Sequence, residues 1–326
     1  MQAPDFWQSG KGGILAELLS PLGALYGLVT RTKLSKTTPW ISPIPVLCVG
    51  NLIAGGAGKT PVAIDLGNRL RGKGKNIHFL SRGYGGNEKG PLLVDPSQHS
   101  FARVGDEPLL LAAHGPTWVS RERKAGCIAA TEAGAEIIVM DDGFQNPYIH
   151  RNFSIIVVDG GFGFGNGKMI PAGPLRETIP EGMARAQSAV VIGEDRTGVI
   201  AQITSQGLTP LQAKLVAKSL PKEIAGNPVI PFAGIGRPEK FFATVAGLDC
   251  SVVTTIPFAD HHPYTNAEMA KLVKMANNAG ARLLTTEKDT KRLPESFLKD
   301  ISVLSVHLEW SDANAVDALL DGIGHA

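Results

Sequence analysis

Short apolar runs recur along the first two thirds of the chain, and they predict the strands of a sheet. The runs lie at residues 46–49, 77–80, 137–140, 155–158 and 189–192. Few polar residues interrupt them, and the stretches between them are long enough to hold helices. Continuous apolar runs of this length are typical of parallel strands that are buried on both faces. The pattern therefore predicts an α/β fold with a parallel sheet.

The pattern changes after residue 192. It loosens over residues 205–222, and a breaker cluster follows at Gly226-Asn227-Pro228. New apolar runs lie at residues 229–232, 251–256, 282–285 and 301–306. They predict a second, smaller α/β domain that begins near residue 220. We expect residues 1–40 to pack on the first domain, residues 41–220 to form it, and residues 221–326 to form the second.

Residues 14–29 have the periodicity of an amphipathic helix. Their large apolar side chains recur at helical spacing, whereas Glu17, Ser20 and several small residues fall on the other side. The flanks are basic, which suits a helix lying in the headgroup layer of an anionic membrane; docking on its own domain is the alternative. The stretch is shorter than the ~20 residues that cross a bilayer, so we expect it not to span. The flanking basic residues are Lys11, Arg31, Lys33 and Lys36.

Charge and cysteine content exclude several classes of protein. The 326 residues include 32 Lys and Arg against 30 Asp and Glu, so no general positive charge points to a nucleic acid partner. Cys48, Cys127 and Cys250 are too far apart for a CxxC metal pattern or a disulfide framework. Isolated thiols of this kind suit a reducing cytosol.

A glycine-rich segment follows the first apolar run and precedes a helical pattern. It reads Gly55-Gly56-Ala57-Gly58-Lys59-Thr60. In a phosphate-binding P-loop, backbone N–H groups close around phosphate oxygens, while Lys59 would reach the β and γ phosphates and Thr60 would ligate Mg²⁺. The full motif has a glycine at position 53, where this chain has Ile53. The match is partial, but its place between strand and helix predicts nucleotide binding.

The apolar run at residues 137–140 ends in two carboxylates, Asp141 and Asp142. An acid at the end of a strand beside a phosphate loop is the arrangement that holds Mg²⁺ in P-loop enzymes. Alone, such a pair is commonly a turn or a helix cap. Together with Lys59 and Thr60 it predicts a metal–nucleotide site.

Several further blocks, in order along nearly the whole chain, carry a resemblance to a known family. They include LSRGYG at 80–85, VGDEP at 104–108, DDGFQ at 141–145, PAGPLRE at 171–177, FAGIGRP at 232–238, DHH at 260–262 and TEKD at 286–289. The chain thus resembles the tetraacyldisaccharide 4′-kinases of lipid A assembly. The resemblance implies a P-loop NTPase-like domain and a smaller α/β domain. It also implies ATP- and Mg²⁺-dependent phosphorylation of an acylated glucosamine disaccharide 1-phosphate at the cytoplasmic face of the inner membrane, with no obligate protein partner.

The resemblance also implies roles for single residues. Asp106 matches the catalytic carboxylate, which would take the proton of the acceptor hydroxyl, and His261 matches the histidine paired with it. Asp106 and Glu107 would otherwise read as a helix N-cap. Glu107 joins Thr60, Asp141 and Asp142 as an expected metal ligand. The expected substrate contacts are Tyr84, Arg123, Gln145, Asn146 and Arg176. The family usually has a histidine where this chain has Asn146, so no histidine role is carried over there.

Three other classes of protein compete with this interpretation. A regulatory P-loop ATPase acting on a protein partner would share the loop, although those with a signature lysine carry it where this chain has Ala54. A soluble small-molecule kinase would leave the apolar, basically flanked N-terminal helix without a task. A GTPase would need an Asn-Lys-x-Asp base reader, which residues 286–289 do not supply.

Overall fold

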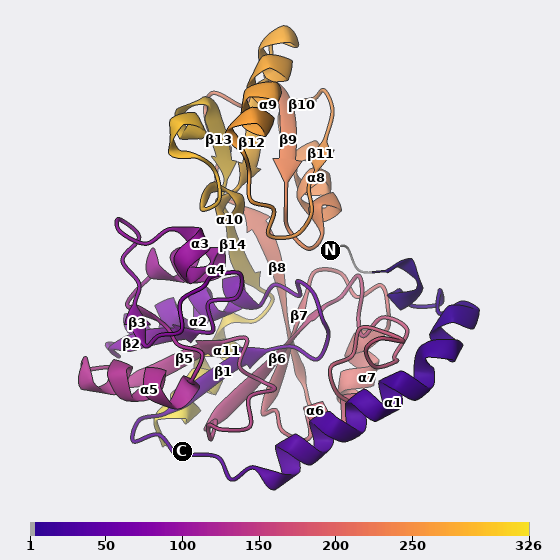
Figure 1. Ribbon diagram of the computed structural model, residues 1–326, viewed down its shortest axis with the longest axis vertical. Coiled ribbons are helices and arrows are strands. Elements are labelled where there is room, and N and C mark those ends of the chain that lie inside the picture. The colour runs from indigo at the N-terminus through magenta and orange to yellow at the C-terminus, as the bar shows by residue number, and fades with distance from the viewer. Residues whose placement is uncertain (1–3, 326) are drawn as a thin grey trace.

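The computed structural model describes residues 4–325 and contains two sheets, one in each of two α/β domains (Figure 1). The large sheet has nine strands in the order β14-β8-β7-β6-β1-β5-β2-β4-β3. All neighbours are parallel except β3 with β4 and β8 with β14. The strands are β1 (Val46–Gly50), β2 (Ile77–Ser81), β3 (Leu92–Leu93), β4 (Thr117–Val119), β5 (Ile137–Asp141), β6 (Phe153–Asp159), β7 (Ser188–Ile192), β8 (Pro210–Ala217) and β14 (Val306–Trp310).

The five apolar runs predicted in the first domain form β1, β2, β5, β6 and β7, so the predicted parallel sheet is confirmed. Side chains alternate along these strands and feed two separate cores. In β1, for example, Val46 and Cys48 pack on one face of the sheet, whereas Leu47 and Val49 pack on the other. Because helices cover both faces, every second position is apolar on each side, which produces the uninterrupted runs.

Helices on the two faces complete these cores. One face packs against α2 (Lys59–Gly72), α4 (Asp106–Ala112) and α11 (Ala313–Asp321). The other packs against α5 (Arg123–Glu132), α6 (Ile179–Met183) and α7 (Val199–Ser205). The short helix α3 (Phe101–Val104) precedes α4. Short 3₁₀ helices lie at η1 (Asp5–Trp7), η2 (Glu295–Asp300) and η3 (Gly322–His325).

The smaller domain is a parallel sheet of five strands with its own core. Its strand order is β10-β9-β12-β13, and β11 also pairs with β9. The strands are β9 (Pro228–Ala233), β10 (Ser251–Val252), β11 (Ile256–Pro257), β12 (Arg282–Thr286) and β13 (Ile301–Leu304). Its helices are α8 (Pro238–Ala246), α9 (Asn266–Asn278) and α10 (Glu287–Thr290).

The end of the chain returns to the large domain, which corrects the predicted range 221–326 of the second domain. β14 pairs antiparallel with β8, and Val316 and Leu320 of α11 lie in the core of the large sheet. β8 and β14 rise side by side between the two domains (Figure 1). The sequence predicted one run at 301–306 because β13 and β14 follow each other with only Ser305 between them.

The N-terminal helix α1 (Gly13–Lys36) runs along the outside of the large domain, near α6 and α7 (Figure 1). Its small-residue side faces the protein: Ala16 and Gly23 are buried, and a Cβ at Gly23 would lie 2.8 Å from the carbonyl oxygen of Met169. Its leucine side is open to solvent, with Ile14 82% and Leu18 71% exposed. At 24 residues the helix is longer than the predicted stretch, and by length and composition alone it could cross a bilayer; that it does not span stays a prediction.

Candidate active site

The phosphate loop lies between the end of β1 and the start of α2. Gly55 has φ +113° and Gly58 has φ +87°, conformations that L side chains rarely adopt. A Cβ at Gly58 would also lie 2.6 Å from Cδ1 of Ile192. Ile53, the departure from the motif, is 3% exposed and forms a bridge with Leu175. The loop therefore begins in the core, and it keeps glycine at the positions where the backbone requires it.

Thr60 and Asp141 form a buried pair beneath the loop. Thr60 Oγ1 donates a hydrogen bond of 2.8 Å to Asp141 Oδ2, and Asp141 Oδ1 has no hydrogen-bond partner among the described residues. Burial and then the charge of Glu107 raise the pKa of Asp141 to about 7. A cation would remove both penalties, so this pair fits Mg²⁺. Within residues 4–325 no three His, Cys, Asp or Glu side chains cluster as metal ligands, so phosphate oxygens would have to complete the shell.

Asp142 stands beside this pair in a left-handed conformation, with φ +52°. Its Oδ1 lies 3.7 Å from Lys59 Nζ and 3.2 Å from Arg176 Nη1. Burial alone would raise the pKa of Asp142, but the charges of Lys59 and Arg176 lower it. A strained non-glycine residue held by two cations is typical of a functional site. Its expected role as a metal ligand stays a prediction, because cations already engage its carboxylate.

Asp106 of the large domain and His261 of the small domain meet where the two domains contact each other. His261 Nδ1 lies 3.0 Å from both carboxylate oxygens of Asp106, which is 2% exposed. His261 has φ +57°, and the ring of Tyr84 lies 5.3 Å from its own ring. Asp106 is the first residue of α4, after Gly105, and its Oδ1 also accepts a hydrogen bond of 2.9 Å from the backbone N–H of Glu107. The contact with the helix end and the pairing with His261 therefore occur together.

Backbone contacts connect this Asp–His pair to the phosphate loop. A Cβ at Gly236 of the small domain would lie 3.2 Å from the backbone nitrogen of Gly56 and 3.5 Å from Asp260 Oδ2. The same Asp260 oxygen lies 3.8 Å from His261 Nε2. The small domain thus contacts the loop through Gly236, and Asp260 lies between that glycine and the Nε2 side of His261.

Two cations beside Asp106 were not predicted from the sequence. Lys288 and Arg292 follow β12 in the small domain, and Arg292 Nε lies 3.1 Å from Asp106 Oδ2. Burial would raise the pKa of Asp106, but the hydrogen bond with His261 and the charges of Lys288 and Arg292 hold it below its usual value. Lys288 Nζ also lies 2.9 Å from Glu107 Oε1. Glu107, expected as a metal ligand, is therefore ion-paired here, and that role stays a prediction.

Two of the expected substrate contacts converge near the acid pair. Arg176 Nη1 donates to Gln145 Oε1 at 3.2 Å, and Gln145 Nε2 donates to the carbonyl of Asn51 at 2.8 Å. Tyr84 is 67% exposed and so is available to a ligand. The sequence could suggest Gln145 and Arg176 only because each belongs to a block that resembles the family. Their mutual contact joins residues 31 positions apart in the chain.

The other two expected contacts are less accessible. Arg123 is 4% exposed, and burial lowers its pKa to about 10; its Nε has no hydrogen-bond partner among the described residues. Asn146 Oδ1 accepts a hydrogen bond of 2.9 Å from the backbone N–H of Tyr148, so its side chain stabilises a local turn. Substrate roles for both residues stay predictions.

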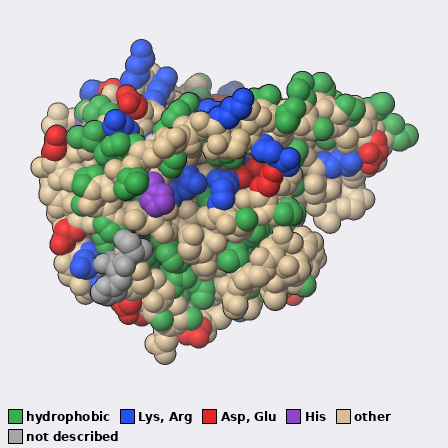
Figure 2. All heavy atoms as spheres, turned by 90° about the horizontal axis from the view of Figure 1, so that it is seen from below, with side chains coloured by type: hydrophobic (Ala, Val, Ile, Leu, Met, Phe, Trp, Pro, Cys, Tyr) green, Lys and Arg blue, Asp and Glu red, His purple; other side chains and the backbone are tan. Residues whose placement is uncertain are grey.

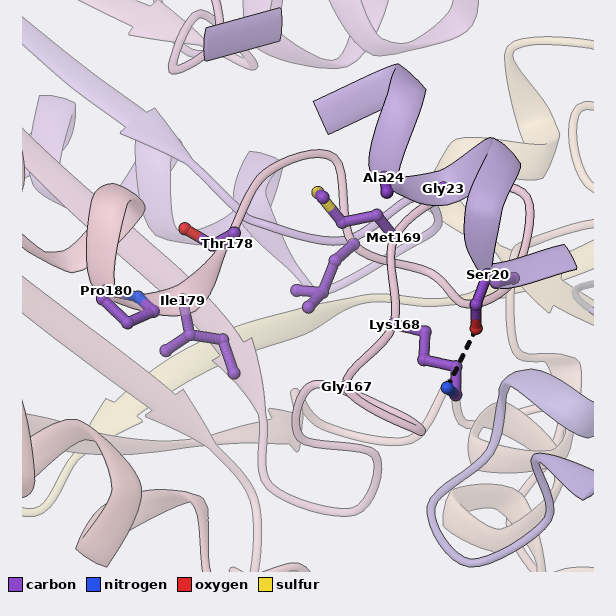
Figure 3. Close-up of a pocket in the computed structure, with 11 residues that line it drawn as sticks. Ser20, Gly23, Ala24, Gly167, Lys168, Met169, Thr178, Ile179 and Pro180 are labelled. Carbon is purple, nitrogen blue, oxygen red and sulfur yellow. Dashed lines mark hydrogen bonds between the residues drawn. The ribbon is translucent and has the colours of Figure 1, made fainter. Parts of the chain in front are cut away.

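A cavity of about 350 Å³ separates α1 from the loop that carries Arg176 (Figure 3). Ser20, Gly23 and Ala24 of α1 line one side, and Lys168 and Met169 line the other. Lys168 Nζ lies 3.0 Å from Ser20 Oγ, which ties the loop to the helix. The segment from residue 167 to residue 180 thus runs between the exposed apolar helix and the phosphate loop.

A phosphate loop, a strand-end acid pair and an Asp–His pair shared between two domains define a P-loop phosphotransferase. The chain belongs to the tetraacyldisaccharide-1-phosphate 4′-kinase family, whose model matches residues 15–324. The resemblance read from the sequence is thereby confirmed. No comparison supports the alternative of a regulatory ATPase.

Known relatives match the chain over almost its full length. It is 49% identical over 324 residues to the tetraacyldisaccharide 4′-kinase of Paramagnetospirillum magneticum, covering 99% of each chain. It is 50% identical over 321 residues to that of Gluconacetobacter diazotrophicus, covering 98% of each. The crystal structure of LpxK from Aquifex aeolicus in complex with ATP superposes with a TM-score of 0.76 at 26% identity, covering 95% of this chain and all of that one.

Proposed function

We propose that this protein transfers the γ-phosphate of ATP to the 4′-hydroxyl of a tetraacylated glucosamine disaccharide 1-phosphate. The observation that carries the proposal is the Asp106–His261 pair, which joins the two domains beside the contact of Gly236 with the phosphate loop. An alcohol acceptor needs a proton acceptor there, whereas an ATPase that acts on water needs no such interdomain pair.

The nucleotide is held by the loop residues. Backbone N–H groups of Gly55 to Gly58 surround the phosphates, and Lys59 contacts the β and γ oxygens. Thr60 and Asp141 would hold Mg²⁺, which neutralises charge on the phosphates. Arg176, placed by Asp142 and Gln145, supplies a further positive charge on the acceptor side.

The proton moves to His261 rather than to Asp106, which revises the expectation from the sequence. Both oxygens of Asp106 face Nδ1 of the imidazole and Asp106 is 2% exposed, so the acceptor hydroxyl cannot easily reach the carboxylate. An Nδ1–H that donates to Asp106 leaves the lone pair on Nε2. The hydroxyl oxygen then attacks the γ phosphorus, its proton passes to Nε2, and ADP leaves. Asp106 fixes the tautomer and stabilises the imidazolium.

The acceptor sugar lies against Tyr84 and Arg176. Tyr84 is exposed next to the His261 ring, and Arg176 reaches from the loop at residues 167–180. A guanidinium can bind phosphate or sugar oxygens in a bidentate manner. Arg123 and Asn146 act indirectly, by stabilising the residues around the site, because their polar groups are buried or already engaged in hydrogen bonds.

The protein acts on the cytoplasmic face of the inner membrane, where ATP is available. Figure 2 shows hydrophobic side chains along the projecting edge on the right of the molecule. The exposed large apolar side chains of α1 are Ile14, Leu15, Leu18, Leu22, Leu25, Tyr26, Leu28 and Val29. Such a face, with basic residues at the end of the helix, suits insertion among lipid headgroups. The loop beneath α1 leads from this face to Arg176.

Replacing Leu18, Leu22 and Leu25 together by Ser is expected to weaken binding to anionic vesicles by at least about 100-fold. Each exposed leucine contributes roughly 1.5–3 kcal/mol when it leaves water, and the fold should survive because all three are more than half exposed. Vesicle sedimentation measures the effect, and high salt should also weaken binding of the intact protein. Val253, Met275 and Leu298, exposed on the small domain, serve as the matched triple-Ser control. Equal binding by both triple variants would contradict the membrane role.

The function itself is tested by ADP formation with and without detergent-solubilised acylated disaccharide 1-phosphate. We expect turnover that depends on the lipid. Turnover that is the same without lipid would point to an ATPase instead.

A further inference from the structure

We propose that Lys288 and Arg292 are positioning residues for the Asp106–His261 pair, an assignment that rests on the proposed kinase function. The two cations are four residues apart in the small domain, at α10 and just after it. They face two successive carboxylates, Asp106 and Glu107, at the start of α4 in the large domain. The contacts of the two cations with these two carboxylates therefore cross between the domains.

Arg292 contacts Asp106 directly and the backbone of the residue next to His261. Its Nε lies 3.1 Å from Asp106 Oδ2, an ion-pair contact without hydrogen-bond alignment. Its Nη1 donates a hydrogen bond of 3.0 Å to the carbonyl of His262, the residue that follows His261. Arg292 thus fixes the carboxylate on one side and the backbone that carries the imidazole on the other.

Arg292 is itself held rigidly within the small domain. Its side chain is 1% exposed, and Nη2 donates to the carboxylate of Asp289 at 2.5 Å and to the carbonyl of Gly234 at 2.9 Å. Asp289 is fully buried and also accepts hydrogen bonds from the Tyr264 hydroxyl at 2.8 Å and from the Gly234 N–H at 3.0 Å. The guanidinium is therefore placed before the domains meet, so it does not have to be ordered when they do.

Lys288 completes the clamp from the more open side. Its Nζ lies 2.9 Å from Glu107 Oε1 and 4.0 Å from Asp106 Oδ2, and its side chain is 20% exposed. Without these cations Asp106 would keep only His261 and the backbone N–H of Glu107 as partners, and neither of them fixes Oδ2 from the side of Arg292. Held by both, it presents its two oxygens to Nδ1, the geometry that keeps the lone pair on Nε2.

The test compares Arg292→Met, Arg292→Lys and Lys288→Met in the lipid-dependent assay. A misplaced carboxylate should lower kcat by about 10²-fold in Arg292→Met and by about 10-fold in Lys288→Met, with KM for ATP within about twofold. Arg292→Lys should recover part of the loss because the positive charge remains. Neighbouring Lys291, which takes part in no ion pair of the described residues, gives the control Lys291→Met with unchanged kcat.

A structural role is separated from a positioning role by repeating each substitution in an Asp106→Asn background. Residues that act through Asp106 should then cause little further loss, whereas a general effect on the fold should multiply the defect. Because Arg292 is buried, thermal unfolding is measured for all variants; Lys288→Met carries the test if Arg292→Met unfolds. Full activity of Lys288→Met and Arg292→Lys, or a multiplied defect, would overturn the proposal while leaving the kinase function intact. A parent enzyme without lipid-dependent turnover would remove both.

Discussion

Lys59→Ala is expected to lower turnover by at least about 10³-fold while leaving the fold intact. Lys59 is the first residue of α2, and its Nζ lies 3.7 Å from Asp142, among charges and outside the apolar core. Its loss removes the cation that stabilises the charge developing on the transferred phosphate. Steady-state ADP formation gives the rate, and circular dichroism reports the fold.

Lys73, at the far end of the same helix, provides the matched control. It pairs with Asp321 at the surface and is distant in sequence from the loop. Lys73→Ala should therefore retain turnover within about twofold, as expected for a surface ion pair. Normal turnover by Lys59→Ala would eliminate the phosphate-loop assignment.

His261→Ala and Asp106→Ala are each expected to lower kcat by ~10²–10⁴-fold, with much smaller effects on KM for ATP. His261 accepts the proton, and Asp106 holds its imidazole in place. Either substitution therefore removes the same proton-accepting unit. The double variant should then be little worse than the more severe single variant. Steady-state kinetics with saturating lipid measures all three.

The result for the double variant decides whether the two residues form one unit. Strictly multiplied defects would mean independent roles and would separate His261 from Asp106.

Asp260→Ala tests the other carboxylate beside the imidazole. Asp260 Oδ2 lies 3.8 Å from His261 Nε2, whereas Asp106 lies 3.0 Å from Nδ1. A smaller effect is expected there, because Asp260 does not set the tautomer.

The large sheet was largely predictable because its central strands are buried on both faces and read as apolar runs. β8 was missed since it lies toward the edge, where most of its side chains are partly or fully exposed. The return of β14 to β8 could not be predicted either, because antiparallel pairing over about ninety residues leaves no local signal. A boundary drawn from the chain order alone assigned that segment to the wrong sheet.

The functional site was likewise predictable from the sequence only in part. The phosphate loop and the acid pair are contiguous in sequence, so their chemistry is visible in a few letters. The pairing of Asp106 with His261 spans 155 residues and came only from the family resemblance. Lys288 falls in the TEKD block, but neither it nor Arg292 could be assigned a role from the sequence, since that role depends on carboxylates more than 180 residues away. Tertiary contacts of this length are visible only in the structure.

Transfer of phosphate to the 4′-hydroxyl is tested most directly by following the γ-phosphate itself. The enzyme is incubated with ATP labelled at the γ position and with tetraacyldisaccharide 1-phosphate in detergent, beside the same lipid lacking its 4′-hydroxyl. For a 4′-kinase we expect label in the lipid at the 4′ oxygen, in an amount equal to the ADP formed. The deoxy lipid should carry no label. Release of the label as free phosphate, with neither lipid labelled, would contradict it.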